Sequence, residues 1–412
     1  MFIFTEQDQM PRFNIAIAGA GPAGVFAAIF AAENPNNSIT IYEKSDPLKT
    51  LLPTGGGRCN LAHFEFDLKA LAANFPRGEK FLYSVLSKFS TADTIEFFEK
   101  IGVKTYTQED MRVFPQCNSS QEVRNALLKR LNTAKNIKIV KSIVKSVKKS
   151  GAKFIVETSN GENAFDAVIL ATGGRGAGHE IARGLGHTVV ELRPALCGLK
   201  IQEEFLTELA GLSIKNVRAS VPAAKIRDLS GDLLFTHNGI SGPLVFKLSS
   251  LCAYCDYSKN APLEVIFNIS GQNFEEFDKS FSRILNNEAK KDISNVLCNF
   301  APKRFCDLIL GHESIAHNKK SGQLNKTERQ KLSKALTELK LNVTAPLKGG
   351  EIVTAGGVCL NEVNSKTMES KIVKNLYFCG ELLDIDGLCG GFNLQNCWST
   401  GFVAGSALKH QI

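Results

Sequence analysis

The chain opens with a pattern of apolar and polar residues that predicts a strand, a tight turn, a helix and a second strand. An apolar run, Phe13–Ala18, ends in the glycine-rich sequence GAGPAG at residues 19–24, and an apolar helical stretch, Val25–Ala32, follows. The next strand-forming run, Ile39–Tyr42, ends at the acidic residue Glu43. This order of elements is the βαβ pattern that binds dinucleotides.

Each polar or glycine position in this pattern has a physical role. Gly19 permits the tight turn, Gly21 lets a pyrophosphate approach the backbone, and Gly24 lets the helix pack closely on the strand. Glu43 can accept hydrogen bonds from ribose hydroxyls. The predicted nucleotide-binding residues here are Gly19, Ala20, Gly21, Pro22, Ala23, Gly24, Glu43 and Lys44. A glycine turn in an unrelated α/β protein is the alternative, and the pattern alone does not separate NAD from FAD.

Farther along the chain, the spacing of apolar residues predicts additional strands. Lys138–Thr158 contains two alternating segments around a turn at Ser150 and Gly151, which predicts a β-meander beside a parallel sheet. Asp166–Thr172 is apolar enough for a buried strand, and Leu376–Cys379 predicts another strand.

The middle of the chain has a different pattern. Residues 196–270 contain short apolar segments broken by Gly, Pro and Asn, which predicts an antiparallel barrel or sandwich. Residues 273–342 are more polar and helical, and Thr327–Gln330 is typical of a capping box at a helix start. Near the C-terminus, Gly390 and Gly391 precede a helix that we expect to end near Ala407, with Gly401 and Gly405 bringing it close to the sheet.

A second glycine cluster stands at residues 54–60, with the sequence TGGGRCN. Three consecutive glycines expose backbone N–H groups and tolerate unusual dihedral angles, so a large flat or charged ligand can lie against the chain. Arg58 adds a cation beside them. A flexible loop is the alternative.

These motifs resemble those of a known family. TGGGRCN is similar to the SGGGRCN element of the bile-acid-inducible N-like, or aminoacetone-oxidase-like, FAD-dependent flavoproteins, which have a glutathione-reductase-type FAD fold and a distant similarity to fumarate reductase flavoproteins. Further matching segments follow in the same order: RVFP at 112–115, VILATGG at 168–174, LLFTHNGISGP at 233–243, VTAGGV at 353–358, LYFCGELLD at 376–384 and GGFNLQ at 390–395. The resemblance covers nearly the whole chain. Thr54 stands in place of the usual serine, and Thr50 stands where a lysine is common.

The resemblance implies FAD as the cofactor and adds residues to its site. It implies that Val144 presents its backbone to the adenine ring, although a plain sheet valine is an equal alternative. Glu381 is expected to face the ribityl chain, and the last helix to face the pyrimidine edge of the flavin, where its dipole favours reduction. The added residues are Gly55, Gly56, Gly57, Arg58, Cys59, Asn60, Val144, Thr172, Gly173, Gly380, Glu381, Gly390, Gly391 and Asn393.

We therefore expect an α/β protein. A Rossmann-like FAD-binding domain with a parallel sheet and a β-meander would be interrupted by an inserted β-barrel domain and a helical cap. The predicted boundaries are 1–195 for the first part of the FAD domain, 196–270 for the barrel or sandwich, 271–345 for the helical cap and 346–412 for the second part of the FAD domain.

Composition adds few constraints. The 412 residues carry a net charge of +8, which suits anionic ligands such as dinucleotides and does not by itself imply nucleic acid. No apolar run is long enough for a transmembrane helix, and no signal peptide is evident, so a cytoplasmic protein without membrane association is expected. The 11 cysteines lack the spacing of a disulfide framework. Cys252 and Cys255 form a single CxxC, which cannot complete a zinc site, so no metal is expected; a redox dithiol stays open.

The expected function is that of an FAD-dependent oxidoreductase acting on a small-molecule substrate, an enone-like compound or oxygen among them. NAD(P)H is a possible transient donor, because the sequence has one clear nucleotide site and no dedicated NAD(P)H domain. The catalytic residues are unknown; His237 and Arg112 are candidates for proton transfer and for binding an acidic substrate. An FAD-dependent enzyme that modifies tRNA or another nucleic acid, and a flavin-binding protein without turnover, are alternatives, although no RNA-binding module is evident. The sequence does not indicate the oligomeric state.

Overall fold

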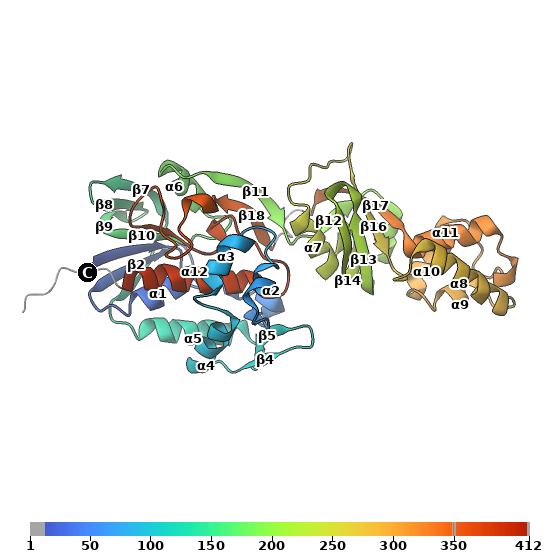
Figure 1. The fold of residues 1–412 in the computed structure, drawn as a ribbon, viewed down its shortest axis with the longest axis horizontal. Helices are drawn as coiled ribbons and strands as arrows, with labels where there is room; N and C mark the ends of the chain where they lie inside the picture. The colour runs from blue at the N-terminus through green and yellow to red at the C-terminus, as the bar shows by residue number, and fades with distance from the viewer. Residues whose placement is uncertain (1–12, 348, 350–351, 410–412) are drawn as a thin grey trace, which may run out of the picture. The chain divides into compact units, whose positions relative to one another are not determined.

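The computed structural model describes residues 13–347, 349 and 352–409 of the chain (Figure 1). Residues 1–12 of the first predicted part of the FAD domain and residues 410–412 of its second part lie outside the described residues. The chain folds into two compact units, one formed by residues 1–193 and 353–412 and the other by residues 194–352.

The first unit is built around a five-stranded parallel sheet. Its strands, in spatial order, are β19 (Leu376–Phe378), β10 (Ala167–Leu170), β1 (Phe13–Ala18), β2 (Asn37–Glu43) and β6 (Ile137–Lys141). The central strand β1 pairs Ile15 with Ile39 on one side and with Ala167 on the other. From β1 the chain passes to β2 and β6 on one side of the sheet, and later to β10 and β19 on the other side. Where the strand order reverses in this way, a ligand-binding crevice is expected at the carboxyl end of the strand, here β1.

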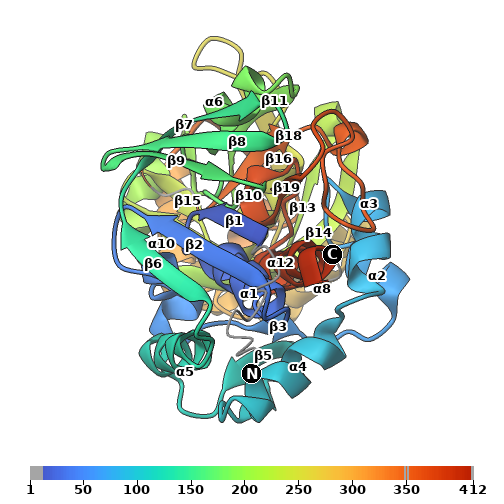
Figure 2. The same ribbon diagram turned by 90° about the vertical axis from the view of Figure 1, so that its left-hand side faces the viewer.

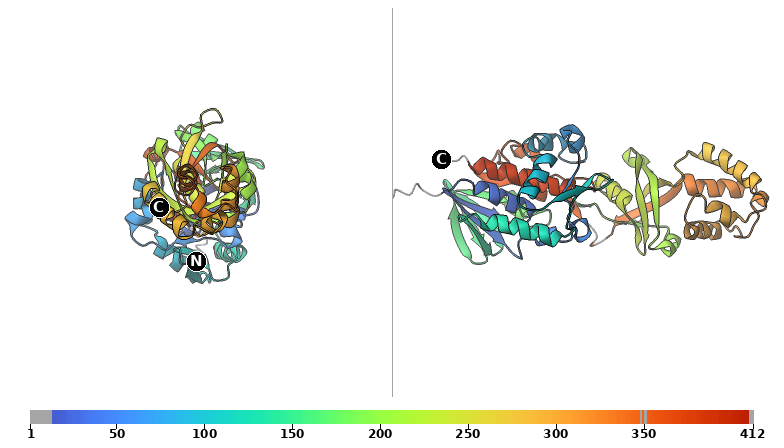
Figure 3. Two further views of the ribbon diagram at one scale, coloured as in Figure 1. Left: turned by 90° about the vertical axis from the view of Figure 1, so that its right-hand side faces the viewer. Right: turned by 90° about the horizontal axis from the view of Figure 1, so that it is seen from below.

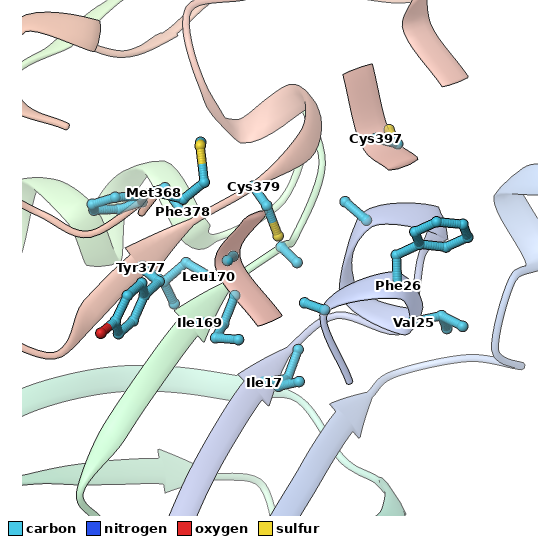
Figure 4. Packing of buried hydrophobic residues seen from close by; sticks show 14 of the residues in the cluster. Ile17, Val25, Phe26, Ile169, Leu170, Met368, Tyr377, Phe378, Cys379 and Cys397 are labelled. Atoms are coloured by element: carbon cyan, nitrogen blue, oxygen red, sulfur yellow. The ribbon is translucent and has the colours of Figure 1, made fainter. Parts of the chain in front are cut away.

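Helices cover one face of this sheet and a meander covers the other (Figure 2). Helices α1 (Pro22–Ala31) and α12 (Phe392–Lys409) pack together on the first face. On the opposite face, β7 (Val144–Ser150), β8 (Lys153–Thr158) and β9 (Gly161–Phe165) form a three-stranded antiparallel meander. Figure 4 shows how the sheet residues Ile17 and Ile169 share one core with Val25 and Phe26 of α1.

The predicted meander is confirmed, and its extent is corrected. Residues 138–141, the start of the predicted alternating segments, belong instead to the edge strand β6 of the parallel sheet. The meander begins at Val144 and gains a third strand, residues 161–165. A half-exposed alternating strand has the same pattern at the edge of either sheet, so periodicity does not distinguish the two positions.

The remaining elements of the first unit surround the sheet. A small antiparallel sheet has the order β3 (Ala62–His63), β5 (Arg112–Pro115), β4 (Thr105–Thr107). The other helices are α2 (Leu68–Ala72), α3 (Glu79–Leu86), α4 (Thr91–Lys100), α5 (Ser120–Asn132) and α6 (Gly178–Gly184). Strands β11 (Val189–Ala195) and β18 (Val353–Val358), on either side of the inserted unit, pair with each other in a two-stranded sheet.

The second unit combines a closed barrel with helices, of which those between residues 274 and 337 lie at one end of the barrel in Figure 3 (right). The barrel order is β12 (Leu199–Ile201), β15 (Gly239–Ser241), β14 (Ile226–Thr236), β13 (Ser213–Val221), β16 (Leu263–Asn268) and β17 (Leu339–Pro346). The helices are α7 (Pro243–Leu251), α8 (Phe274–Asn287), α9 (Ile293–Leu297), α10 (Lys303–His312) and α11 (Lys326–Thr337).

Two features of this unit differ from the expectation. The segment Leu339–Pro346, most of which the sequence pattern assigned to the helical cap, pairs with β12 and β16 and completes the barrel. The capping box of α11 is formed by Asn325 and Glu328, two residues before the predicted Thr327–Gln330. Both Asn325 and Thr327 are suitable residues for the cap position, so the sequence alone left the start ambiguous.

Gly401 and Gly405 of α12 approach a helix and not the sheet. A Cβ atom at Gly401 would lie 2.5 Å from the carbonyl oxygen of Ala23, and one at Gly405 would lie 2.4 Å from the carbonyl oxygen of Ala27. Both carbonyls belong to α1, so the two helices touch backbone to backbone. The buried rings of Phe26 and Trp398, with centroids 4.7 Å apart, extend the same contact.

This contact predicts that Gly405→Ala destabilises the first unit. The added methyl group must push α12 away from α1, which typically costs about 1–3 kcal/mol in a tightly packed core. Urea unfolding of the two proteins measures the difference. Gly184→Ala is the control, because nothing lies within 4 Å of a Cβ at that helical glycine. Equal stability losses in the two variants would contradict the proposed packing.

Candidate functional site

The first glycine turn has the geometry of a nucleotide-binding turn. Gly19 has a φ of +106°, and a Cβ there would lie 2.4 Å from the carbonyl oxygen of Ala171. A Cβ at Gly24 would lie 2.0 Å from the carbonyl oxygen of Gly19. At Gly21 the nearest atom to a Cβ is the hydroxyl of Thr50, at 3.8 Å, so the turn is open there. Backbone packing therefore requires glycine at positions 19 and 24, whereas Gly21 leaves room for a ligand.

The N-terminus of α1 is available to an anion. Gly21 is the N-cap residue, Pro22 follows it, and no side chain caps the helix. The first N–H groups of a helix have no acceptor within the helix and lie at the positive end of its dipole. Ala20 and Ala23 are buried in the same turn. A pyrophosphate is the kind of group that such a turn binds.

Glu43 ends β2 beside this turn. One of its carboxylate oxygens accepts a hydrogen bond from the N–H of Ala20 (2.8 Å), and the other accepts from the N–H (2.9 Å) and the hydroxyl (2.9 Å) of Ser45. These bonds fix the carboxylate next to the glycine turn. Oxygen lone pairs remain for a ribose. Lys44, the next residue, is exposed.

The triple-glycine segment has three left-handed residues in succession. The φ angles of Gly55, Gly56 and Gly57 are +59°, +68° and +86°. A Cβ at Gly55 would lie 2.8 Å from the backbone nitrogen of Asn60, whereas nothing lies within 4 Å of a Cβ at Gly56 or Gly57. Gly55 is thus required by packing, and the other two present open backbone. Cys59 is buried, and burial raises the pKa of its thiol to about 12, so it packs as an uncharged group.

The triple-glycine segment is joined directly to the turn that precedes α12. With its amide oriented so that both ends are paired, Asn60 accepts a hydrogen bond from the N–H of Gly391 (2.9 Å) and donates to the carbonyl of Ala62 (3.0 Å). The indole N–H of Trp398 donates to the carbonyl of Leu61 (2.9 Å). His63 lies 3.1 Å from the carbonyl oxygen of Gly390. Residues more than 300 positions apart therefore form one wall.

Two guanidinium groups lie against one aromatic ring beside this wall. The guanidinium carbon of Arg58 lies 4.1 Å from the ring centroid of Phe114, and that of Arg112 lies 5.5 Å from it. The hydrogen bond between Arg112 and Asp110 raises the pKa of Arg112 and lowers the pKa of Asp110. Arg58 donates only to the carbonyl of Gly55 (3.3 Å), and among the described residues no carboxylate pairs with it.

The C-terminal strand meets the first glycine turn. Gly380 has a φ of +72°, and a Cβ there would lie 2.8 Å from the Cβ of Ala23. Its N–H donates to the hydroxyl of Thr400 (2.9 Å). Burial raises the pKa of the neighbouring Glu381, while the N–H of Gly174 and the charge of Arg175 act in the opposite direction.

Several buried polar groups at this edge have no partner within the protein. The hydroxyl of Thr172 and both amide atoms of Asn396 are buried without a hydrogen bond in the described part of the chain. Gly173 has a φ of +74° and open space around a Cβ. Unpaired buried polar groups are costly, so they are typical of places where a ligand or water supplies the partner.

The turn between β19 and α12 is held from two sides. Asp386, fully buried, forms an ion pair with Arg77. The side-chain amide of Asn393 donates to the carbonyl of Gly387 (2.8 Å) and accepts from its N–H (2.8 Å). The amide oxygen and the amide nitrogen of Asn393 are thus both engaged within the turn, so a predicted contact with a cofactor would use the backbone, the second N–H or the second lone pair.

The other predicted residues take no part in these contacts. Val144 is buried at the start of β7 and pairs with Thr158. His237 is exposed in the turn between β14 and β15, in the second unit. Its catalytic role stays a prediction. Cys252 is buried in the same unit, and burial, together with the nearby thiol of Cys255, raises its pKa to about 12, which lowers its reactivity as a thiolate.

Three residues that the sequence reasoning did not assign to the site lie within it: His63, Thr50 and Asn396. His63 and Asn396 each follow a recognised motif by a few residues. The sequence contained a signal for Asn396, because Gln395, Asn396, Ser399 and Thr400 are polar residues close together in one helix. The structure shows that all four are fully buried. No sequence signal connected His63 with Gly390.

The described residues were also compared with the requirements of a membrane-spanning helix and of a metal site. Over residues 13–347, 349 and 352–409, no helix is both long and apolar enough to cross a membrane. The same residues contain no group of three or more His, Cys, Asp or Glu side chains that could hold a metal ion.

The residues present fit an extended dinucleotide. One end has an uncapped helix N-terminus and a carboxylate, which suit a pyrophosphate and a ribose. The other has open glycine backbone, a cation without a carboxylate partner and a second helix start. Gly380 connects the two ends through its contacts with Ala23 and Thr400. FAD has this distribution of chemical groups.

Comparison with known proteins gives a family match over residues 13–407, to the family described as HI0933-like protein Rossmann domain. The chain is 31% identical over 409 residues to the 3-dehydro-bile acid delta(4,6)-reductase of Clostridium scindens, covering 96% of this chain and 98% of that protein. It is 29% identical over 414 residues to the ribosomal RNA dihydrouridine synthase of Escherichia coli, covering 97% and 98% of the two chains. Among solved structures, a variant of the E. coli quinol fumarate reductase aligns with a TM-score of 0.49 and 16% identity, covering 97% of this chain and 70% of that one.

The geometry of Glu43 predicts that Glu43→Arg abolishes FAD retention. Arginine cannot accept the hydrogen bonds of Ala20, Ser45 or a ribose. The visible absorbance of the purified protein measures its flavin content. Glu96→Arg, at an exposed position on α4, is the control for the charge change. A yellow Glu43→Arg protein would show that this carboxylate is not part of the site.

The contact of Asn60 with Gly391 predicts that Asn60→Ala weakens FAD binding without preventing folding. The variant loses the hydrogen bonds of Asn60 with Gly391 and Ala62. The loss of the Gly391 bond alone costs about 1–1.5 kcal/mol, which corresponds to roughly a tenfold higher Kd. Fluorescence titration of the apoprotein with FAD measures this. Asn125→Ala, on the exposed side of α5, is the matched control. If the two variants bind FAD equally well, the contact does not support the site.

Proposed function

Since the chain belongs to the HI0933-like family and is an FAD-dependent oxidoreductase, we propose that it reduces a carbon–carbon double bond conjugated to a carbonyl group, with NAD(P)H as the electron donor. When bound, FAD accepts a hydride from the donor and passes it to the substrate. The chain binds and orients both.

One observation carries this proposal: the triple-glycine segment and the start of α12 meet through Asn60 and Gly391, while Gly380, before α12, contacts Ala23 of the first glycine turn. A dinucleotide bound along this edge would have its redox ring at the meeting point. The N–H groups and dipole of α12 favour negative charge there. Open backbone at Gly56 and Gly57 leaves space on the same side.

The substrate class is supported by the two similar proteins. Their names, a bile acid delta(4,6)-reductase and a dihydrouridine synthase, both describe the addition of two hydrogen atoms across a ring double bond. In a 3-oxo-4,6-diene and in uracil, that double bond is conjugated to a carbonyl. A hydride acceptor of this electronic type therefore suits the proposed site.

NAD(P)H is proposed as a transient partner. The described residues contain one glycine turn of the dinucleotide-binding type, at Gly19–Gly24, and the glycines at 173–178 do not repeat it. The donor would therefore bind without a dinucleotide-binding turn of its own. The substrate is a small molecule under this proposal.

A second candidate is the reduction of a base in RNA. It is favoured by the two similar proteins named ribosomal RNA dihydrouridine synthase, from E. coli and from Haemophilus influenzae, which share 29% and 28% identity with the chain. Exposed lysines on β6 and β7, among them Lys141 and Lys148, would contact phosphates. Binding to RNA would then fall steeply with salt concentration.

Anaerobic titration tests the proposed function. NADH or NADPH is expected to bleach the bound flavin, and a 3-oxo-4,6-diene bile acid is expected to restore its absorbance with formation of the reduced steroid. Ribosomal RNA in place of the steroid tests the second candidate. A flavin that neither nicotinamide bleaches would overturn the NAD(P)H linkage and would favour a flavin-binding protein without turnover.

A further inference from the structure

His63 lies where the triple-glycine segment meets the turn before α12. Its backbone belongs to β3, three residues after Asn60. Its Nδ1 atom lies 3.1 Å from the carbonyl oxygen of Gly390, and its ring packs on that of Phe392 with centroids 4.5 Å apart. Two contacts on different sides therefore hold the imidazole in one orientation.

The contact with Gly390 fixes the tautomer of the ring. A carbonyl oxygen only accepts hydrogen bonds, so Nδ1 must carry the proton. The second nitrogen, Nε2, has no hydrogen-bond partner among the described residues, and the side chain is partly exposed. Nε2 is therefore the end of the ring that is available to a ligand.

The charged groups around His63 come from three segments. His63 pairs with Arg112 in the sheet formed by β3 and β5, so the two side chains lie on the same face. Arg112 is neutralised in part by Asp110, and Cys389 lies close enough to affect its pKa. Glu65 follows His63 by two residues. Of these side chains, the imidazole of His63 is the one that has both a donor and an acceptor nitrogen.

We propose that His63 is the proton donor of the double-bond reduction, a role that rests on the proposed function. A hydride from NAD(P)H, delivered through the cofactor, forms a C–H bond at one carbon of the double bond. The π electrons move to the other carbon, which takes the proton from Nε2 of the imidazolium. NAD(P)H is oxidised, the alkene is reduced, and solvent reprotonates His63.

The Gly390 contact favours this role. After Nε2 has lost its proton, the neutral ring keeps the proton on Nδ1, which is the tautomer that the Gly390 carbonyl already binds. No rearrangement of the ring is needed during the proton transfer. Arg112, on the same face, is placed to attract the carbonyl oxygen of a substrate, where negative charge develops.

His63→Asn separates the two functions of the ring. The asparagine amide can occupy the place of Nδ1 and donate to Gly390, but it offers nothing in the place of Nε2 and cannot supply a proton. In His63→Gln the amide can occupy the place of Nε2, and the contact of Nδ1 with Gly390 is lost. His317→Asn is the matched control, because His317 is an exposed histidine of the second unit.

The experiment measures the two half-reactions separately in stopped flow. His63→Asn is expected to retain FAD and to be reduced by NAD(P)H at the wild-type rate. Its anaerobic reoxidation by a 3-oxo-4,6-diene bile acid, or by ribosomal RNA if that is the wild-type substrate, is expected to fall by about 10²-fold or more, in the range of general acid catalysis.

A measurement independent of turnover accompanies it. In long-range ¹H–¹⁵N spectra of the FAD-loaded protein, the neutral form of the His63 ring should carry its proton on Nδ1, and the signals of this ring should be absent in His63→Asn. A neutral ring with its proton on Nε2 would overturn the proposal.

The outcomes distinguish a failure of the proposed role of His63 from a failure of the proposed function. If the wild-type protein is reduced and reoxidised and His63→Asn behaves identically, the role of His63 is wrong and the proposed function stands. If neither probe reoxidises the reduced wild-type protein, the double-bond reduction fails, and the proton-donor role fails with it. If His63→Asn and His317→Asn slow reoxidation equally, the effect is not specific to His63.

Discussion

The direct backbone contact between α1 and α12 is the constraint on which the rest of this structure depends. It brings the two helix starts, which come from opposite ends of the sequence, to the same edge of the parallel sheet. Gly401 and Gly405 permit the contact along the helices, and Gly380 permits it at the turn next to Ala23. The buried rings of Phe26 and Trp398 then fill the space between the helices. A larger separation would pull Gly391 away from Asn60 and would open the wall that the two chain ends form.

The sequence predicted this fold well where the information was local. The strand, glycine turn and helix at residues 13–32 have patterns that no distant contact is needed to explain, and the structure contains them. The predictions were wrong where the position of a segment depends on its partners. Residues 137–141 and Leu339–Pro346 each have the pattern of a half-exposed strand, and only the neighbouring strands decide to which sheet each one belongs. Gly401 and Gly405 were correctly recognised as points of close approach, but what they approach is fixed by the position of α1.

The same distinction applies to the candidate site. Glycine positions could be predicted because a positive φ or a missing side chain restricts the residue type, as at Gly19 and Gly55. His63 could not be predicted, because its partner Gly390 is 327 residues away. Asn393 was predicted to contact the cofactor, and its side-chain amide forms hydrogen bonds with Gly387.

The paired strands β11 and β18 have a consequence for the evolution of such proteins. They mark where the chain leaves the nucleotide-binding unit and where it returns, and they are hydrogen-bonded to each other. The two points are thus held together by the host unit itself, so the entropy of closing the loop changes only slowly with the length of what is inserted. Inserted domains of different length can therefore be accommodated at this junction with little change in the stability of the nucleotide-binding unit.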